Sequence, residues 1–227
     1  MVNIPISPVA WQPCYRIISS RFPPTTLFDR VASENDMQMI FTLENMTNPR
    51  IREELGDLSL VPPEERVYGP GSTPIMAAFT HINGHETRFS DGSYGVYYAA
   101  IDPETAIAET VYHREKFLAY TNEPPIDLTM RVYAVDLRAD LHDIRGLSAA
   151  MPDIYHPTEY RQAQALGAQL RNGESWGIVY DSVRREGGQC AGVFRPKALS
   201  NCRQSKHLSY QWNGHRITHV LELSLLY

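Results

Sequence analysis

Short apolar runs separated by turn residues dominate the chain from about residue 96 onward. The runs at 96–101, 130–137, 177–183 and 190–194 have the length and composition of buried strands. Two further runs flank the dipeptide at 213–214, an Asn-Gly pair, and this pattern predicts a hairpin with a two-residue type I′ turn. The sequence therefore predicts that strands make up most of the second half.

The N-terminal third shows helical spacing instead. Apolar residues recur at helical intervals in 37–45, and the segment 49–55 begins with proline after asparagine and ends before glycine. Further along, Asp102 followed by proline is typical of a helix start and predicts a helix over 103–117. A fourth helix is expected over 158–172, where apolar residues again share one face and an Asn-Gly pair ends the pattern.

The order of these elements indicates the fold class. The Pro- and Gly-rich segment 61–74 predicts a loop and is the best candidate boundary, and the pattern from Ile75 onward is mostly that of strands. Helices in the first part and strands in the second favour an α+β fold with a mixed or mostly antiparallel sheet over a doubly wound parallel one. The length of 227 residues favours one domain.

Composition narrows the class of protein. An apolar fraction of 43% and a charged fraction of 21% are ordinary for a globular domain and argue against a disordered or coiled-coil chain. The net charge of −5 argues against a general nucleic-acid binder. Residues 183–220, however, hold seven Lys/Arg and one acid. This basic segment is either a solvated face or a local attraction for an anionic ligand or an acidic partner.

The chain also lacks the marks of export. Its longest apolar runs are far shorter than the ~20 residues a membrane span needs, and its first residues lack the basic and apolar regions of a signal peptide. Three cysteines without CxxC spacing fit a reduced, cytoplasmic protein. No metal is expected, because the pairs His81/His85 and His215/His219 are better explained as ordinary polar histidines than as ligands.

The segment 88–109, RFSDGSYGVYYAAIDPETAIAE, carries the most informative chemistry. It places Arg88 before a turn, Tyr98 in a buried strand and Glu109 two turns into the following helix. Taken singly, Arg88 is a surface cation or the partner of a nearby acid such as Glu86 or Asp91. Tyr98 is a packed strand residue, and Glu109 is a solvated helix residue.

Together with the later segments GIVYDSVRREGG and VFRP, this stretch resembles the RES domain family. The family is named for an arginine, a glutamate and a serine, which fall on Arg88, Glu109 and Ser182. Tyr98 matches the strand tyrosine of the family, and Tyr15-Arg16 resembles the Tyr-Arg near its start.

The resemblance covers roughly residues 11–20 and 69–220. It implies a single RES-type domain over 1–227, with a helical, acidic insertion at about 26–72 and the motif-bearing core at about 73–220. The insertion follows from the 71 residues between Arg16 and Arg88, because many short members have only about 30 there. Cys190 stands near the place where the family usually has an asparagine.

The resemblance implies an ADP-ribosyltransferase-like core and a toxin that consumes NAD as its substrate. Glu109 would grip the ribose and stabilise an oxocarbenium-like transition state, while Ser182 would fix its position. Arg88 would bind the pyrophosphate or the adjacent ribose, with Arg16 as a second phosphate contact. Tyr98 would pack against the cationic nicotinamide ring.

The implied protein partner is an Xre-like helix-turn-helix antitoxin. ADP-ribose transfer to a protein is the first expectation, because the long N-terminal region offers room for an acceptor surface. Hydrolysis or phosphorolysis of NAD at the same site is the second. A non-catalytic binding module with a basic C-terminal face is the third, and neither a membrane nor specific direct binding of nucleic acid is expected.

Overall fold

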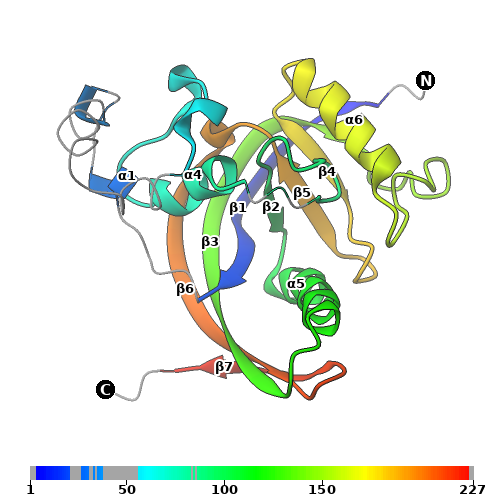
Figure 1. Ribbon diagram of the computed structural model, residues 1–227. Helices are drawn as coiled ribbons and strands as arrows, with labels where there is room; N and C mark the ends of the chain where they lie inside the picture. The colour runs from blue at the N-terminus through cyan, green and yellow to red at the C-terminus, as the bar shows by residue number, and fades with distance from the viewer. Residues whose placement is uncertain are drawn as a thin grey trace.

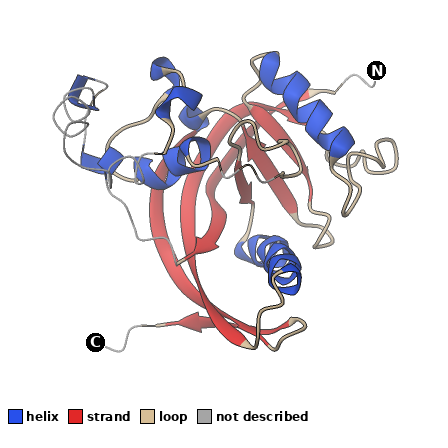
Figure 2. Cartoon of the chain, in the orientation of Figure 1, coloured by secondary structure: helices blue, strands red, loops and turns tan. Residues whose placement is uncertain are grey.

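A seven-stranded sheet with the strand order β1-β2-β5-β4-β3-β6-β7 lies at the centre of the protein (Figures 1 and 2). The computed structural model describes residues 4–20, 27–30, 33, 35–37, 56–82, 84 and 86–224. The strands are β1 (Ile6–Ser19), β2 (Tyr97–Ala100), β3 (Ile126–Asp143), β4 (Gly177–Asp181), β5 (Gln189–Val193), β6 (Leu199–Trp212) and β7 (Ile217–Leu223).

The long strand β3 curves the sheet back on itself. One of its edges pairs antiparallel with β1, while the other pairs antiparallel with β6 and then, at His142 and Asp143, parallel with β4. Because β1 also pairs with β2 at Tyr15, these pairings join β1, β2, β5, β4 and β3 in a ring. All pairings except that of β3 with β4 are antiparallel, which confirms the expected α+β class.

Helices cover both faces of this sheet (Figure 1). They are α1 (Leu27–Arg30), α4 (Ser72–Thr80), α5 (Pro103–Tyr120) and α6 (Arg161–Asn172), with 3-10 turns at Leu58–Leu60, Pro63–Glu65 and Pro196–Ala198. The start of α5 follows the prediction, because the Asp102 carboxylate accepts a hydrogen bond from the Thr105 amide at 2.7 Å and caps the helix. The structure extends this helix to Tyr120.

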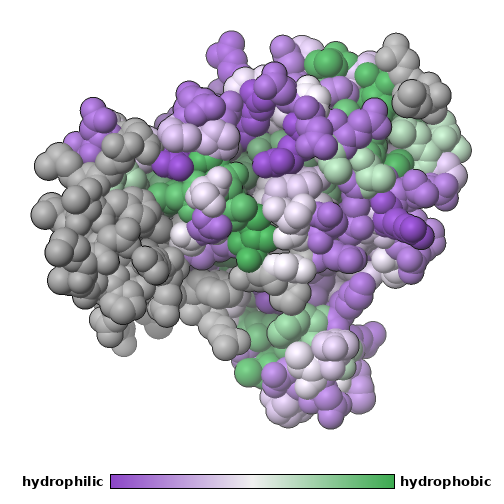
Figure 3. Space-filling view, turned by 45° about the horizontal axis from the view of Figure 1, so that its top comes forward, coloured by the Kyte–Doolittle hydropathy of each residue, from purple (hydrophilic) through white to green (hydrophobic). Residues whose placement is uncertain are grey.

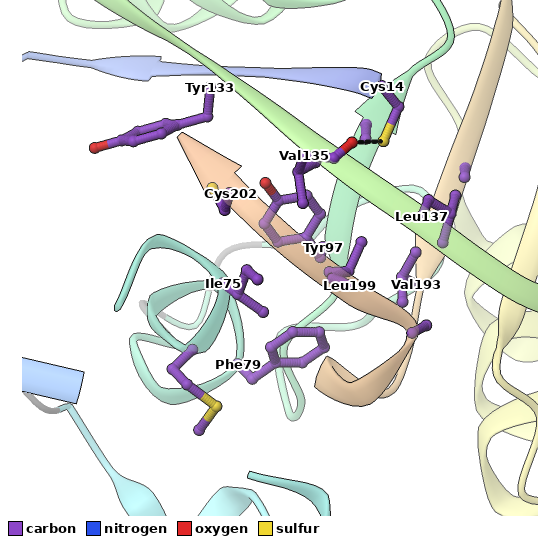
Figure 4. Close-up of a cluster of buried hydrophobic side chains, with 14 of the residues drawn as sticks. Cys14, Ile75, Phe79, Tyr97, Tyr133, Val135, Leu137, Val193, Leu199 and Cys202 are labelled. Carbon is purple, nitrogen blue, oxygen red and sulfur yellow. Dashed lines mark hydrogen bonds between the residues drawn. The ribbon is translucent and has the colours of Figure 1, made fainter. Parts of the chain in front are cut away.

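Two apolar clusters form the core. One lies under α4 and includes Phe79, Tyr97 and Val135, together with Cys14, whose thiol donates to the Val135 carbonyl at 3.3 Å (Figure 4). The other lies under α5 and α6. The alternation of β2 divides its residues between them, so that Tyr97 and Ala99 belong to the first cluster and Tyr98 and Ala100 to the second. Tyr98 therefore faces the side of the sheet that carries α5.

The sequence missed two elements near the start of the chain. The strand β1 was not expected, because prolines at positions 8 and 13 interrupt its alternation and a register shift lies between Trp11 and Cys14. The helix α4 occupies the segment after Ile75 where strands were expected, since a short apolar run does not separate a helix from a strand. The expected helices at 37–45 and 49–55 lie outside the described residues, except that Met37 is helical.

The predicted hairpin is present, but its turn is longer than expected. The register shifts near its end and pairs Trp212 with Ile217, so four residues connect β6 to β7. The Asn213 side chain explains the difference, because its Oδ1 accepts hydrogen bonds from the amides of His215 and Arg216 at 2.9 Å. The helix expected from Thr158 begins at Arg161, and Gly173 follows its end as predicted.

Among the helices in the described part of the chain, none has both the length and the apolarity to cross a bilayer. On the face shown in Figure 3, apolar residues gather near the middle, with hydrophilic residues above and to the right of them. A single domain with an acidic insertion at 26–72 stays a prediction, since the continuous stretch 38–55 of that segment lies outside the described residues.

Candidate active site

A cleft of about 900 Å³ lies between α4 and α5. One wall is the C-terminal part of β1, from Tyr15 to Ser19, which continues past the single pairing of β1 with β2. The other walls come from α4, α5, β2 and the segment 86–88. Four of the five residues expected to form the site line this cleft: Arg16, Arg88, Tyr98 and Glu109.

Glu109 is held by the fifth expected residue. The Ser182 hydroxyl, at the end of β4, donates to Glu109 Oε1 at 2.6 Å. The same hydroxyl accepts hydrogen bonds from the amides of Arg184 and Arg185, both at 3.1 Å, and this turn fixes the serine side chain. The carboxylate on α5 is thereby oriented by a turn that lies 73 residues away in the sequence.

Cys190 is the nearest cysteine to this carboxylate. It lies on β5 with its Sγ 3.8 Å from Glu109 Oε1 and lines the cleft. Burial and the neighbouring Glu109 charge raise the pKa of the Cys190 thiol well above its usual value. The thiol thus stays protonated at neutral pH, as is typical of a buried, unreactive cysteine.

Tyr98 anchors the segment that carries Arg88. Its hydroxyl lies 2.9 Å from the Thr87 hydroxyl and accepts a hydrogen bond from the Phe89 amide at 2.9 Å. Burial raises the pKa of Tyr98, so the phenol stays neutral. On the other side of this segment, Gly167 lets α6 lie directly against the Phe89 carbonyl, where a Cβ atom would clash. Two elements therefore hold the backbone on either side of Arg88.

Arg88 itself is 8% exposed and is anchored by the loop before α6. Its Nη1 donates to the carbonyls of Ile154 and His156 at 2.9 and 3.0 Å, and its guanidinium lies 4.7 Å from the Tyr160 ring centroid. Among the described residues no carboxylate pairs with it, which excludes the salt bridge to Glu86 or Asp91 as the reason for its place. Both carbonyl contacts use the Nη1 nitrogen, and Arg88 lines the cleft.

Arg16 lies on the face of the sheet opposite to the Tyr98 side chain. Its Nη1 donates to the Tyr98 carbonyl at 3.2 Å, and its guanidinium lies 4.5 Å from the Tyr97 ring centroid. Burial lowers the pKa of Arg16, but an arginine keeps its charge through any physiological pH. The structure therefore brings the two expected arginines to the same cleft, Arg16 from the strand β1 and Arg88 from the segment before β2.

The sequence did not single out several residues that line the same cleft. These include Thr110, Arg114, Arg131 and Tyr133. Another is His113, one helical turn beyond Glu109; its enclosure by the cleft, followed by the charges of Arg184 and Arg88, lowers its pKa to about 4. Only Arg131 left a signal in the sequence, as one of the two charged residues, with Asp136, in the mostly apolar strand pattern at 130–137.

The cleft is positive although the chain is acidic. Its lining contains four arginines and two glutamates, whereas the whole chain has a net charge of −5. The basic segment 183–220 contributes no arginine or lysine to this lining. Several of its cations instead pair with carboxylates: Arg185 with Asp102, Arg195 with Glu65, Arg203 with Asp136, and Lys206 with Glu222. These pairs favour a neutralised face over a binding surface for that segment.

The described residues of the cleft include no cluster of metal ligands. Within the described ranges, no group of three or more His, Cys, Asp or Glu side chains is arranged to hold an ion. His85, from the pair considered above, lies outside the described residues.

One known domain family matches most of this chain. Residues 63–213, about two thirds of the chain, match the sequence profile of the RES domain. The chain belongs to the RES domain family. The matched segment contains Arg88, Tyr98, Glu109 and Ser182, while Arg16 precedes it.

This RES domain chain is similar to one curated protein and to one solved structure. It is 33% identical over 204 residues to the uncharacterized protein y4oC of Sinorhizobium fredii, covering 90% of this chain and 84% of that protein. Among solved structures, it is similar to the M. tuberculosis MbcT-MbcA toxin-antitoxin complex, with a TM-score of 0.47, 11% identity and coverage of 92% of this chain and 87% of that one.

Proposed function

We propose that this RES domain protein is a toxin that cleaves NAD at the bond between nicotinamide and ribose. The observation that carries the proposal is the carboxylate of Glu109, fixed by Ser182 within a cleft that also presents several arginines. A carboxylate suits a cationic sugar, and the arginines suit the two phosphates of a dinucleotide. Membership of the RES domain family supports the same substrate.

The reaction needs little acid–base chemistry from the protein. The bond from the ribose C1′ to the nicotinamide nitrogen breaks with both electrons moving to the nitrogen, so nicotinamide leaves neutral and no acid must protonate it. The ribose acquires oxocarbenium character, which Glu109 stabilises while it accepts a hydrogen bond from a ribose hydroxyl. The acceptor then bonds to C1′ and releases its proton to the solvent.

The remaining residues position the substrate. Arg88, anchored through one nitrogen to the Ile154 and His156 carbonyls, offers the rest of its guanidinium to the pyrophosphate or the adjacent ribose. Arg16 supplies a second phosphate contact. Tyr98 holds the segment beside Arg88 through its hydroxyl and packs its ring against the nicotinamide.

For the acceptor, we propose a protein side chain, with water and phosphate as alternatives. Purified protein incubated with NAD labelled in the adenylate moiety should release nicotinamide and, when lysate is added, transfer label to protein bands. Free ADP-ribose or its phosphorylated form without labelled protein would instead assign hydrolysis or phosphorolysis. If nicotinamide is not released under any of these conditions, the NAD-cleaving function is wrong and a binding module becomes the better explanation.

The proposed role as a toxin makes a prediction in cells. Because loss of NAD or modification of an essential protein stops growth, expression of the wild type in the bacterial cytoplasm should arrest growth. Co-expression of an Xre-like helix-turn-helix protein encoded beside it should restore growth. The growth curves need the inactive Glu109→Gln variant as a control, and normal growth with abundant folded wild type would contradict toxicity.

A further inference from the structure

Arg131 on β3 is a buried arginine that lacks an acidic partner. Only 6% of the residue is exposed, and its Nε has no hydrogen-bond partner. Its Nη1 donates to the Tyr133 hydroxyl at 3.3 Å, and no carboxylate within the described part of the chain forms an ion pair with it. Because a charge withdrawn from water is costly without a counter-charge, this arrangement points to an anion that the protein binds.

Arg131 lies beside a second arginine of the same kind. In the pairing of β1 with β3, Ile18 stands opposite Arg131 and Arg16 stands opposite Tyr133. Directly opposed residues share a face and successive residues alternate, so Arg16 and Arg131 are diagonal neighbours on one face of the sheet. Both line the cleft, and in the described residues neither is paired with an acid.

This pair lies on the other face of the sheet from the Glu109 carboxylate. Tyr133 and Val135, on the same face of β3 as Arg131, belong to the apolar cluster under α4. Glu109 projects from α5, which packs on the opposite cluster. The cleft reaches both sides because it borders the end of β1. A ligand with its reacting sugar at Glu109 can therefore extend an anionic group toward Arg131.

We propose that Arg131, together with Arg16, forms a phosphoryl-binding subsite at the α4 side of the cleft. Two adjacent guanidinium groups offer several N–H donors, which match the four terminal oxygens of a pyrophosphate, or the oxygens of a terminal or free phosphate, better than the two of a carboxylate. The proposal rests on the proposed function in taking a dinucleotide as the principal ligand. The phosphoryl group belongs to its pyrophosphate, to the 2′-phosphate of NADP, or to a free phosphate that acts as the acceptor.

The test compares Arg131→Met with Arg138→Met, an exposed arginine on the same strand. Both changes are made in the Glu109→Gln protein so that no ligand is consumed, and calorimetry measures binding of ADP, NAD, NADP and inorganic phosphate. We expect Arg131→Met to weaken at least one of these ligands by about 10-fold or more, since a charge-assisted contact is lost. Arg138→Met should leave all four affinities unchanged.

The pattern across ligands identifies the phosphoryl group. Equal losses for ADP, NAD and NADP assign the pyrophosphate, a loss confined to NADP assigns the 2′-phosphate, and a loss confined to inorganic phosphate assigns an acceptor site. Each of these results supports the subsite. Affinities that match those of Arg138→Met for all four ligands overturn it.

Thermal melts provide a second measurement. Because the unpaired charge destabilises the ligand-free fold, Arg131→Met should melt at or above the temperature of its parent, and ligands should raise its melting temperature less. A lower melting temperature with unchanged affinities assigns a structural role to Arg131 and overturns the proposal. If Arg131→Met does not fold, Arg131→Lys keeps the charge and should still weaken binding.

The binding experiment is independent of the proposed reaction. NAD that is bound but never cleaved by the wild type would refute the proposed function and leave the subsite standing. NAD that is cleaved normally when Arg131→Met is made in the wild-type protein, together with unchanged affinities in the Glu109→Gln background, would refute the subsite alone.

Discussion

Replacement of Glu109 by glutamine is expected to lower the rate of NAD cleavage by roughly 10²-fold or more. Glutamine preserves the size of the side chain, and its amide oxygen still accepts the hydrogen bond that the Ser182 hydroxyl donates at 2.6 Å. What disappears is the negative charge beside the ribose as the nicotinamide leaves. The rate should be measured as nicotinamide release at saturating NAD, so that the chemical step rather than binding is compared.

Glu104→Gln is the matched control for this experiment. Glu104 lies in the first turn of the same helix, is itself exposed, and does not line the cleft. Its variant should retain wild-type activity, and both variants should melt close to the wild type. If folded Glu109→Gln keeps more than half of the activity, Glu109 is not the catalytic carboxylate.

Replacement of Arg88 should produce the other large effect. Arg88→Ala is expected to reduce NAD cleavage by about 10²-fold or more, because it removes a positioned cation from the cleft. Arg88→Lys should fall between alanine and the wild type, since lysine keeps the charge but loses the planar fork. Both rates are to be measured over a range of NAD concentrations, because a lost substrate contact raises KM as well as lowering kcat/KM.

The structure adds a stability effect that must be separated from the catalytic one. Arg88→Ala leaves the Ile154 and His156 carbonyls without their donor, which costs about 1–3 kcal/mol when such groups stay buried. Arg184→Ala is the control, because Arg184 Nη2 donates to the Pro157 carbonyl of the same loop without lining the cleft. Arg184→Ala should therefore melt earlier but keep its activity per folded molecule. An Arg88→Ala protein that behaves in the same way would falsify the assignment of Arg88 to the active site.

Local features that depend on neighbouring residues were predictable from the sequence. The cap at Asp102 and the start of α5 follow from side-chain and proline chemistry within one turn of helix. The strands β2, β4 and β5 follow from short apolar runs between turn residues, and their order after the helices indicated the α+β class. These features need no knowledge of distant contacts.

The elements that were missed depend on such contacts. The strand β1 contains prolines that weaken its local preference, yet it forms because it pairs along β3 from Ile6 to Ser19. The turn at Asn213 differs from a two-residue turn because its side chain binds two backbone amides and the register shifts beside it. For β1, pairing energy spread over many residues outweighs local propensity, whereas at the turn the hydrogen bonds of one side chain change the loop length.

The candidate site also has features that the sequence predicted and features that it did not. The sequence by itself determined the residue types, since Arg88, Tyr98, Glu109 and Ser182 stand in motifs that resemble those of the RES domain. Only the tertiary structure decided the contacts between them. The Ser182 hydroxyl donates to Glu109, and the Tyr98 hydroxyl accepts from the backbone amide beside Arg88. The tertiary structure alone placed Arg131 next to Arg16, because strand register, which brings residues 115 positions apart onto one face, is fixed by packing across the whole sheet.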